Sequence, residues 1–274
     1  NLQVYEGEGE FRASLPGWEA RERHGIDFRH MNAEEMAEVQ PGLSPRFTHA
    51  GFTPDWMNVV DPEVWTKHLA HQFVARGGII ETREIRALRA RQDGAEAITS
   101  EGAIRAAKIV VAAGAWSHHL ARTLGDKIPL ETERGYHTQI MAPGLSMKHS
   151  IIWPARAFMV TPTAGGIRVG GTVEMAGLEA APDYRRAKVT VKRAMTALPN
   201  LKADNTSEWM GHRPALPDTV PILSASAKTR GVYYATGHGH LGLTYAATTA
   251  RLMGELVTGA KPSVDLHPYR VNRF

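Results

Sequence analysis

Residues 235–244 read Ala-Thr-Gly-His-Gly-His-Leu-Gly-Leu-Thr, and the kind of turn that they form decides which fold the sequence predicts. Its glycines, Gly237, Gly239 and Gly242, fit the G-x-G-x-x-G pattern of dinucleotide-binding turns. A strand pattern precedes the stretch and a helical pattern follows it, as that motif requires. A helix N-terminus carries partial positive charge and free N–H groups. The stretch therefore predicts a turn that approaches a negatively polarised group or, in the simplest alternative, a glycine-rich loop without a ligand.

The chain after this turn argues against a complete dinucleotide-binding unit. Such a unit needs a second parallel strand after the helix, with an acid near its end for the ribose. The expected helix covers residues 243–257, and the short charged remainder contains Pro262 and Pro268, which make a poor strand. We therefore expect the turn at Gly237 to bind one edge of a ligand and not a whole dinucleotide.

The first part of the chain shows mainly helical patterns. A helix is expected over residues 18–37, with a break near Gly25 and an N-cap at Asn32, followed by a loop over residues 43–60. Asp61 and Pro62 then open a second helix, because they suit the N-cap and the first helical position. Short strands are expected next, at residues 79–80, 85–91 and 97–98.

The rest of the chain alternates between two kinds of structure. A continuous apolar run over residues 108–113, ending at Gly114, predicts a buried parallel strand, and a helix should follow over residues 115–124. Shorter strand patterns then suggest an antiparallel sheet. These strands are expected at 136–141, 151–153, 157–161, 167–171 and 207–213, with a helix at 184–198 before the last of them and one more strand at 232–236.

This order predicts a mixed α/β and α+β fold, in which an antiparallel-sheet domain is inserted into a second domain. Residues 1–55 and 128–215 are assigned to the inserted domain. Residues 56–127 and 216–274 are assigned to the α/β domain.

The composition excludes several classes of functional site. The chain has 274 residues and a formal net charge of +4, and it has no cysteine, which excludes disulfides, zinc–thiolate sites, iron–sulfur ligation and thiol nucleophiles. Its densest basic run, between Arg83 and Arg91, alternates with apolar residues as on a solvated strand face, so no nucleic-acid partner is expected. His238 and His240 have zinc-like spacing but no carboxylate close by in sequence, so no metal is expected.

Four further segments carry a resemblance when taken together with residues 235–244. They read VVAAGAWS at 110–117, ERGY at 133–136, GGTVE at 170–174 and WMGHRPALPD at 209–218. Their order and spacing resemble the FAD-dependent D-amino-acid oxidase family, and most closely its bacterial D-amino-acid dehydrogenase branch of the small-subunit type. The resemblance implies FAD as cofactor, a partial Rossmann-like FAD-binding domain and an inserted antiparallel-sheet substrate domain.

The resemblance also implies roles for individual residues. Arg213 would bind the substrate carboxylate, because a guanidinium matches a carboxylate bidentately. Tyr136 and Met159, together with His137, would form the wall of the substrate pocket. No catalytic side chain is assigned. The residues expected to contact the cofactor are Ile85, Ala113, Gly114, Trp116, Gly237, His238, Gly239, His240, Leu241, Gly242, Leu243 and Thr244.

One departure from the family pattern concerns the cofactor. The family opens with a βαβ unit that holds the FAD pyrophosphate. Residues 7–10, Gly-Glu-Gly-Glu, are no substitute, because two acids would repel a pyrophosphate and no helical pattern follows directly. The expectation is a truncated chain that binds FAD weakly or not at all and is inactive alone.

The resemblance implies oxidative deamination of D-amino acids, with electrons passed to a quinone or another carrier. The expected location is cytoplasmic, with peripheral contact at the inner face of a bacterial membrane. A first alternative is oxidation of a secondary or simple amine such as sarcosine, glycine or hydroxyproline. A second alternative is an inactive fragment or binding module without FAD.

Overall fold

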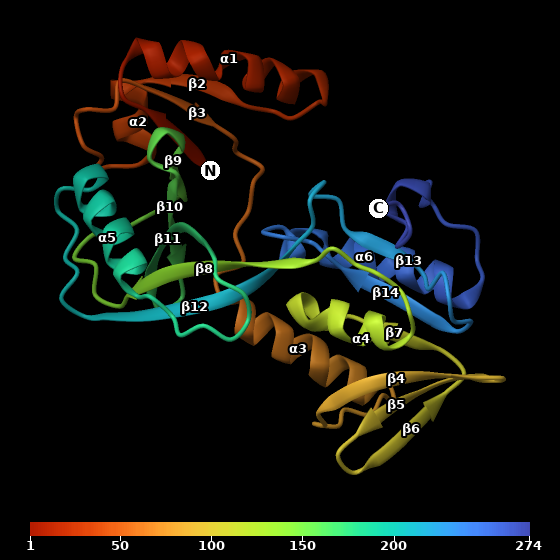
Figure 1. The fold of residues 1–274 in the computed structure, drawn as a ribbon. Helices are drawn as coiled ribbons and strands as arrows, with labels where there is room; N and C mark the ends of the chain where they lie inside the picture. Colours follow the sequence, from red (N-terminus) through yellow and green to blue (C-terminus); the bar gives the residue numbers. More distant parts are fainter. The chain divides into compact units, whose positions relative to one another are not determined.

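The structure is a computed structural model that describes residues 1–274, and the chain divides into two compact units (Figure 1). Unit 1 comprises residues 1–79, 135–173 and 182–210. Unit 2 comprises residues 80–134, 174–181 and 211–274. Helices and both parallel and antiparallel strands occur, which confirms the mixed fold class. The assignment of one part to substrate and another to cofactor stays a prediction.

The largest sheet has eight strands in the order β12-β8-β11-β10-β9-β1-β3-β2, and most of its residues belong to unit 1. Its strands are β1 (Leu2–Tyr5), β2 (Arg29–Asn32), β3 (His49–Phe52), β8 (Glu131–Ile140), β9 (Ile151–Trp153), β10 (Phe158–Thr163), β11 (Gly166–Met175) and β12 (Thr206–Ala215). The strands predicted to be antiparallel pair that way where β9, β10 and β11 meet, whereas β1, which was not among them, runs parallel to β9, with Leu2 opposite Ile151. No local pattern reveals that pairing, since the two strands are far apart in sequence.

The helices of unit 1 are α1 (Glu8–Arg23), α2 (Ala33–Val39), α3 (Pro62–Ala75) and α5 (Arg185–Ala197). The helical region predicted over residues 18–37 does break near Gly25 and restart at Asn32, but β2 lies between α1 and α2 and was not predicted. The expectation that no helix follows Gly7 is also wrong: α1 begins at Glu8, whose acid suits the positive end of a helix. The loop expected over residues 43–60 contains β3.

The two predicted N-caps are confirmed. Asn32 accepts a hydrogen bond from the backbone N–H of Glu35 at 3.0 Å, and the Glu35 side chain bonds back to the Asn32 N–H at 2.8 Å. Asp61 accepts from the Val64 N–H at 3.0 Å. Each side chain satisfies a backbone donor that the first helical turn leaves without a partner.

Unit 2 holds two three-stranded sheets, with orders β13-β14-β7 and β4-β5-β6. Its strands are β4 (Ile85–Arg91), β5 (Gly94–Thr99), β6 (Gly102–Ala106), β7 (Ile109–Val111), β13 (Ile222–Ala225) and β14 (Val232–Thr236), and its helices are α4 (Ser117–Thr123) and α6 (Gly242–Thr258). The parallel strand predicted over 108–113 is confirmed, because β7 pairs in parallel with β14. The strand expected at residues 79–80 is wrong, since those residues form no strand.

A buried carboxylate fixes β14 in place. Asp126 accepts a hydrogen bond from the Tyr234 hydroxyl at 2.8 Å and a further one from the Ser226 hydroxyl. Burial, aided by the adjacent Asp126 carboxylate, raises the pKa of Tyr234 well above its usual value, so the hydroxyl stays a donor at neutral pH. This network anchors the strand that leads directly into the glycine turn at Gly237.

None of the helices combines the length and the apolar character that crossing a lipid bilayer requires.

Candidate functional site

Two glycines give the turn between β14 and α6 its shape. Gly237 has φ 85°, and a Cβ built there would lie 2.2 Å from Leu216 Cδ1, so a larger residue would be both strained and blocked. Gly239 has φ 51°, but a Cβ there would meet no atom within 4 Å. A side chain at Gly237 would therefore collide with a packed residue of the protein interior. At Gly239 only the backbone conformation favours glycine, because no atom lies near the position of a Cβ.

The backbone N–H groups of this turn fall into two sets. The Gly239 N–H donates to Pro214 O at 2.8 Å, and the Leu241 N–H donates to His238 O at 2.9 Å. The first hydrogen bond of α6 runs from the Tyr245 N–H to Leu241 O at 2.9 Å. The N–H groups of Gly242, Leu243 and Thr244 precede that bond and have no carbonyl partner within the helix. Because the Leu241 N–H is used within the turn, the amides of Gly242, Leu243 and Thr244 are the ones available to a ligand.

Two segments predicted to contact the cofactor lie together in unit 2. The Thr236 hydroxyl donates to Gly114 O at 3.0 Å, which joins the end of β14 to the residues after β7. Trp116 lies edge-on to His212, with ring centroids 5.3 Å apart. Parallel strands place their carboxyl ends at one edge of a sheet, which is where open α/β sheets bind ligands. The fold therefore brings Gly114 and Gly237 to one edge.

A pocket of about 420 Å³ opens beside the turn. Its lining comes from the turn itself, from α6, from the loop after β12 and from β8: Glu133, Ala215, Leu216, Thr219, Gly237, His238, Gly239, His240, Leu241 and Tyr245. His240 Nε2 lies 2.8 Å from Glu133 Oε2, across 107 residues of sequence. His238 Nε2 instead lies 3.0 Å from Thr249 Oγ1. The two histidines thus have different partners, and no cluster of metal-ligating side chains forms around them.

Glu133 is a site residue that the sequence does not reveal. No carboxylate lies near the two histidines in sequence, whereas β8 brings Glu133 to the turn from a distant part of the chain. Arg213 of β12 is half-buried, and burial lowers the pKa of its guanidinium while the charge of Glu133 partly opposes that change. An arginine stays charged despite such a shift. Glu133 therefore acts electrostatically on both His240 and Arg213.

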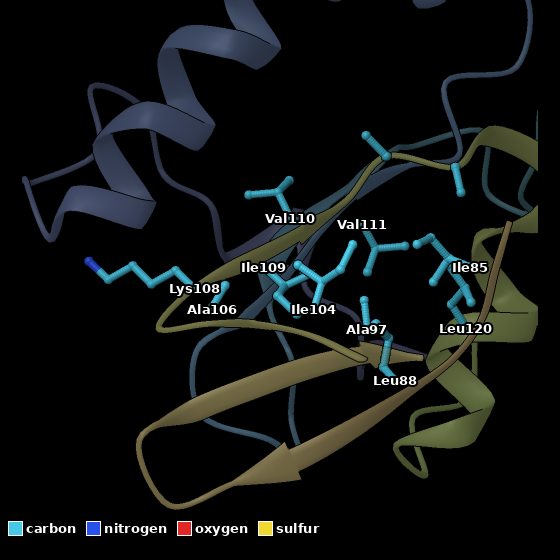
Figure 2. Close-up of a pocket in the computed structure, with 12 residues that line it drawn as sticks. Ile85, Leu88, Ala97, Ile104, Ala106, Lys108, Ile109, Val110, Val111 and Leu120 are labelled. Carbon is cyan, nitrogen blue, oxygen red and sulfur yellow. The ribbon is translucent and has the colours of Figure 1, made fainter. Parts of the chain in front are cut away.

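Ile85 and Ala113 lie in a second pocket of unit 2, of about 530 Å³ (Figure 2). Its lining is almost entirely apolar: Ile85, Leu88, Ala97, Ile104, Ala106, Lys108, Ile109, Val110, Val111, Ala112, Ala113 and Leu120. Figure 2 shows the Lys108 side chain extending away from the others, and its amine donates to Val257 O. Two of the predicted cofactor residues thus share one apolar surface.

The three residues predicted for the substrate pocket wall belong to unit 1. Tyr136 is buried, and its hydroxyl accepts a hydrogen bond from the Asp183 N–H at 3.0 Å. Met159 is half-buried on β10, opposite Gly170. The His137 ring lies 5.0 Å from the Trp209 ring, measured between centroids. Their role at the substrate stays a prediction.

The half-buried imidazole of His238 gives the first testable prediction. Burial lowers its pKa below the usual 6.5, so the unfolded chain binds this proton more readily than the folded chain. The stability that this shift contributes is complete above about pH 6.5 and is lost as the pH falls below it. We expect the free energy of urea unfolding to fall between about pH 7.5 and pH 5.5, and to fall less in His238→Gln.

Four other histidines keep part of this dependence in the variant. Burial also lowers the pKa of His30, His118, His149 and His212. An unfolding free energy with the same pH slope in His238→Gln as in the unchanged chain would show that His238 contributes nothing to it.

Comparison with known proteins identifies the family of the chain. The model of the FAD-dependent oxidoreductase family named DAO matches residues 1–256. A D-amino-acid oxidase of Bradyrhizobium diazoefficiens is 35% identical over 278 residues, and the match covers 100% of this chain and 66% of the relative. A D-amino acid dehydrogenase of Paramagnetospirillum magneticum is 30% identical over 290 residues, with the same two coverages. The chain thus spans just under two thirds of the length of these relatives.

Solved structures show the same fold. The glycine oxidase of Geobacillus kaustophilus superimposes with a TM-score of 0.88 at 21% identity, covering 100% of this chain and 74% of that one. The family model extends over most of the chain, from residue 1 to residue 256. The chain therefore belongs to the DAO family of FAD-dependent oxidoreductases.

Proposed function

We propose that this protein oxidises D-amino acids with FAD and forms the corresponding keto acid and ammonia. The observation that carries the proposal is Arg213, a half-buried cation on β12 in the same unit as the glycine turn. The relatives at 35% and 30% identity, named D-amino-acid oxidase and D-amino acid dehydrogenase, support the substrate class.

The residues of unit 2 fit the cofactor that defines the family. Gly239 bends the backbone beside open space, and the N–H groups of Gly242 to Thr244 lie at the positive end of α6. These groups would hold the electron-rich pyrimidine edge of a flavin. Gly114 and Trp116 would hold the middle of the cofactor, and the apolar pocket at Ile85 would receive a flat ring.

The protein's own part in the reaction is orientation and charge. When bound, FAD accepts the hydride from the substrate Cα. Arg213 would hold the substrate carboxylate bidentately, which fixes the direction of the Cα–H bond. Glu133 would hold His240, and with it the turn. No general base is needed if the amine arrives neutral, and the imino acid that leaves the site hydrolyses in water.

We further propose that the electrons pass to a quinone or another carrier. The relative named D-amino acid dehydrogenase supports a carrier, and the relative named D-amino-acid oxidase makes oxygen the alternative acceptor. A second candidate function is oxidation of glycine or a secondary amine. It is supported by a glycine oxidase of Pseudomonas putida, which is 29% identical over 263 residues and covers 94% of this chain and 70% of its own length.

Product analysis separates these functions. Flavin-loaded protein would be given D-alanine, L-alanine, glycine or sarcosine, with a quinone analogue under argon or with oxygen alone. We expect ammonia and pyruvate from D-alanine, formed faster with the quinone analogue. Methylamine from sarcosine at a higher kcat/KM would favour the second candidate. Absence of flavin absorbance that persists after FAD is added would favour a non-catalytic binding module over both functions for the chain as given.

A further inference from the structure

Helix α5 of unit 1 has a one-sided charge. Its thirteen residues read RRAKVTVKRAMTA, with five lysines and arginines and no acid. By contrast, α1, α3 and α6 each carry both basic and acidic side chains. The basic residues of α5 are Arg185, Arg186, Lys188, Lys192 and Arg193. Such a helix needs an explanation, because like charges at this spacing repel one another.

The inward face of α5 explains how the helix is held. Ala187, Thr190, Ala194 and Ala197 are buried, and they recur at a spacing of three and four residues. Ala194 and Ala197 join the core cluster of unit 1, and the helix packs on β10 (Figure 1). These short side chains bring the helix close to the sheet. Its long basic side chains therefore lie on the face of the helix that is turned away from the sheet, or at the edges of that face.

One basic side chain of α5 forms an ion pair with a nearby acid. Arg185 is paired with Asp183 at 2.8 Å, and this pairing lowers the pKa of the Asp183 carboxyl, which keeps it ionised. Arg193 donates to Arg156 O at 2.7 Å, and a backbone carbonyl satisfies a donor without cancelling its charge. By sequence, residues 183–197 hold five cations and one anion, and Lys188 and Lys192 are exposed.

The outward face also carries apolar side chains. On a helical wheel, Lys188 and Lys192 lie at its centre, with Met195 on one flank and Val189 on the other. Val189 and Met195 are each 45% exposed, and both lysines are exposed. Tyr184, at the N-terminus of the helix, is 38% exposed. A basic centre with apolar flanks and an aromatic end is typical of helices that lie on a membrane surface.

We propose that the outward face of α5 docks the protein on an anionic lipid surface. Lys188 and Lys192 face the lipid phosphates, while Val189 and Met195 enter the headgroup layer. A nucleic acid would match the charge equally well, but it offers no apolar layer that could bury the Val189 and Met195 side chains. An anionic lipid surface offers both, so it is the better occupant. This inference does not depend on the proposed reaction, because α5 carries none of the residues assigned to it.

Vesicle binding tests the proposal directly. The protein would be sedimented with phosphatidylcholine vesicles, with and without phosphatidylglycerol, at low and high salt. We expect binding only to the anionic vesicles, and weakening with salt as charges are screened. The double variant Lys188→Gln/Lys192→Gln should bind about 30-fold more weakly at low salt, since each basic residue near an anionic surface contributes about 1 kcal/mol.

A matched control removes the same charge elsewhere. Lys228 and Arg230 are both exposed, in unit 2. Lys228→Gln/Arg230→Gln should bind almost as the unchanged protein does, and circular dichroism would show that both variants are folded. Equal losses in the two double variants, or no binding to anionic vesicles, would overturn the proposal.

A third variant separates lipid from nucleic acid. Val189→Ser/Met195→Ser keeps every charge and should weaken vesicle binding while leaving any binding to a DNA duplex unchanged. Unchanged vesicle binding in this variant, or tighter binding of duplex DNA than of anionic vesicles by the unchanged protein, would also overturn the proposal.

Discussion

Replacing Arg213 with alanine in the flavin-loaded protein is expected to lower kcat/KM for a D-amino acid by about 10²- to 10³-fold. This corresponds to about 3–4 kcal/mol, which is the usual cost of removing one partner of a buried, hydrogen-bonded charge pair. Arg213 is half-buried and stays charged, so a substrate carboxylate that reaches it exchanges water for a charged donor. Steady-state kinetics with D-alanine would measure the loss.

Two further variants show whether the loss comes from carboxylate binding. Arg213→Lys keeps the charge but not the planar fork, so it should recover only part of kcat/KM. Arg230→Ala removes an exposed arginine of the same unit and should leave kcat/KM unchanged. Flavin absorbance should be equal in all three proteins. Normal turnover in Arg213→Ala would remove Arg213 from the substrate site.

Gly237→Ala is expected to destabilise unit 2 by about 2–4 kcal/mol, the sum of left-handed backbone strain and overpacking. Gly237 has φ 85°, and the added methyl carbon would stand 2.2 Å from Leu216 Cδ1. Gly239→Ala should cost only about 1–2 kcal/mol, because it brings strain without a collision. Urea unfolding would measure both.

A double variant identifies the collision itself. Leu216→Ala removes the atom that the new methyl group would strike, at its own cost as a buried core residue. We expect Gly237→Ala/Leu216→Ala to be less destabilised than the sum of the two single variants by about 1–2 kcal/mol. Strictly additive costs would mean that backbone strain alone explains the glycine.

The glycine turn was predictable because the residues of the turn itself determine its shape. Three glycines between a strand and a helix determine both the turn and the helix start, and the structure has α6 begin at Gly242. The parallel strand at β7 was equally local, since a continuous apolar run ending in glycine is typical of one. Local patterns of this kind carry over directly into structure.

The contact of Glu133 and the pairing of β1 were not predictable, for the opposite reason. The contact of Glu133 with His240 depends on a separation of 107 residues, and the parallel pairing of β1 with β9 depends on a longer one. In the helical region predicted over residues 18–37, the break near Gly25 and the N-cap at Asn32 were correct, but β2, a short strand paired with β3, was missed. In each case a tertiary partner, and not the segment's own sequence, decides the structure.

The position of β1 also sets the order in which the protein can fold. β1 lies between β3 and β9, and β9 follows it by almost 150 residues. Closing a loop of that length costs about 2 kcal/mol more than closing one a tenth as long. During synthesis β1 can pair with β3 early, but its other edge stays open until the ribosome has released residues 151–153. The nascent chain therefore carries an unprotected strand edge for much of its synthesis, and slow refolding with aggregation at high concentration is the expected consequence.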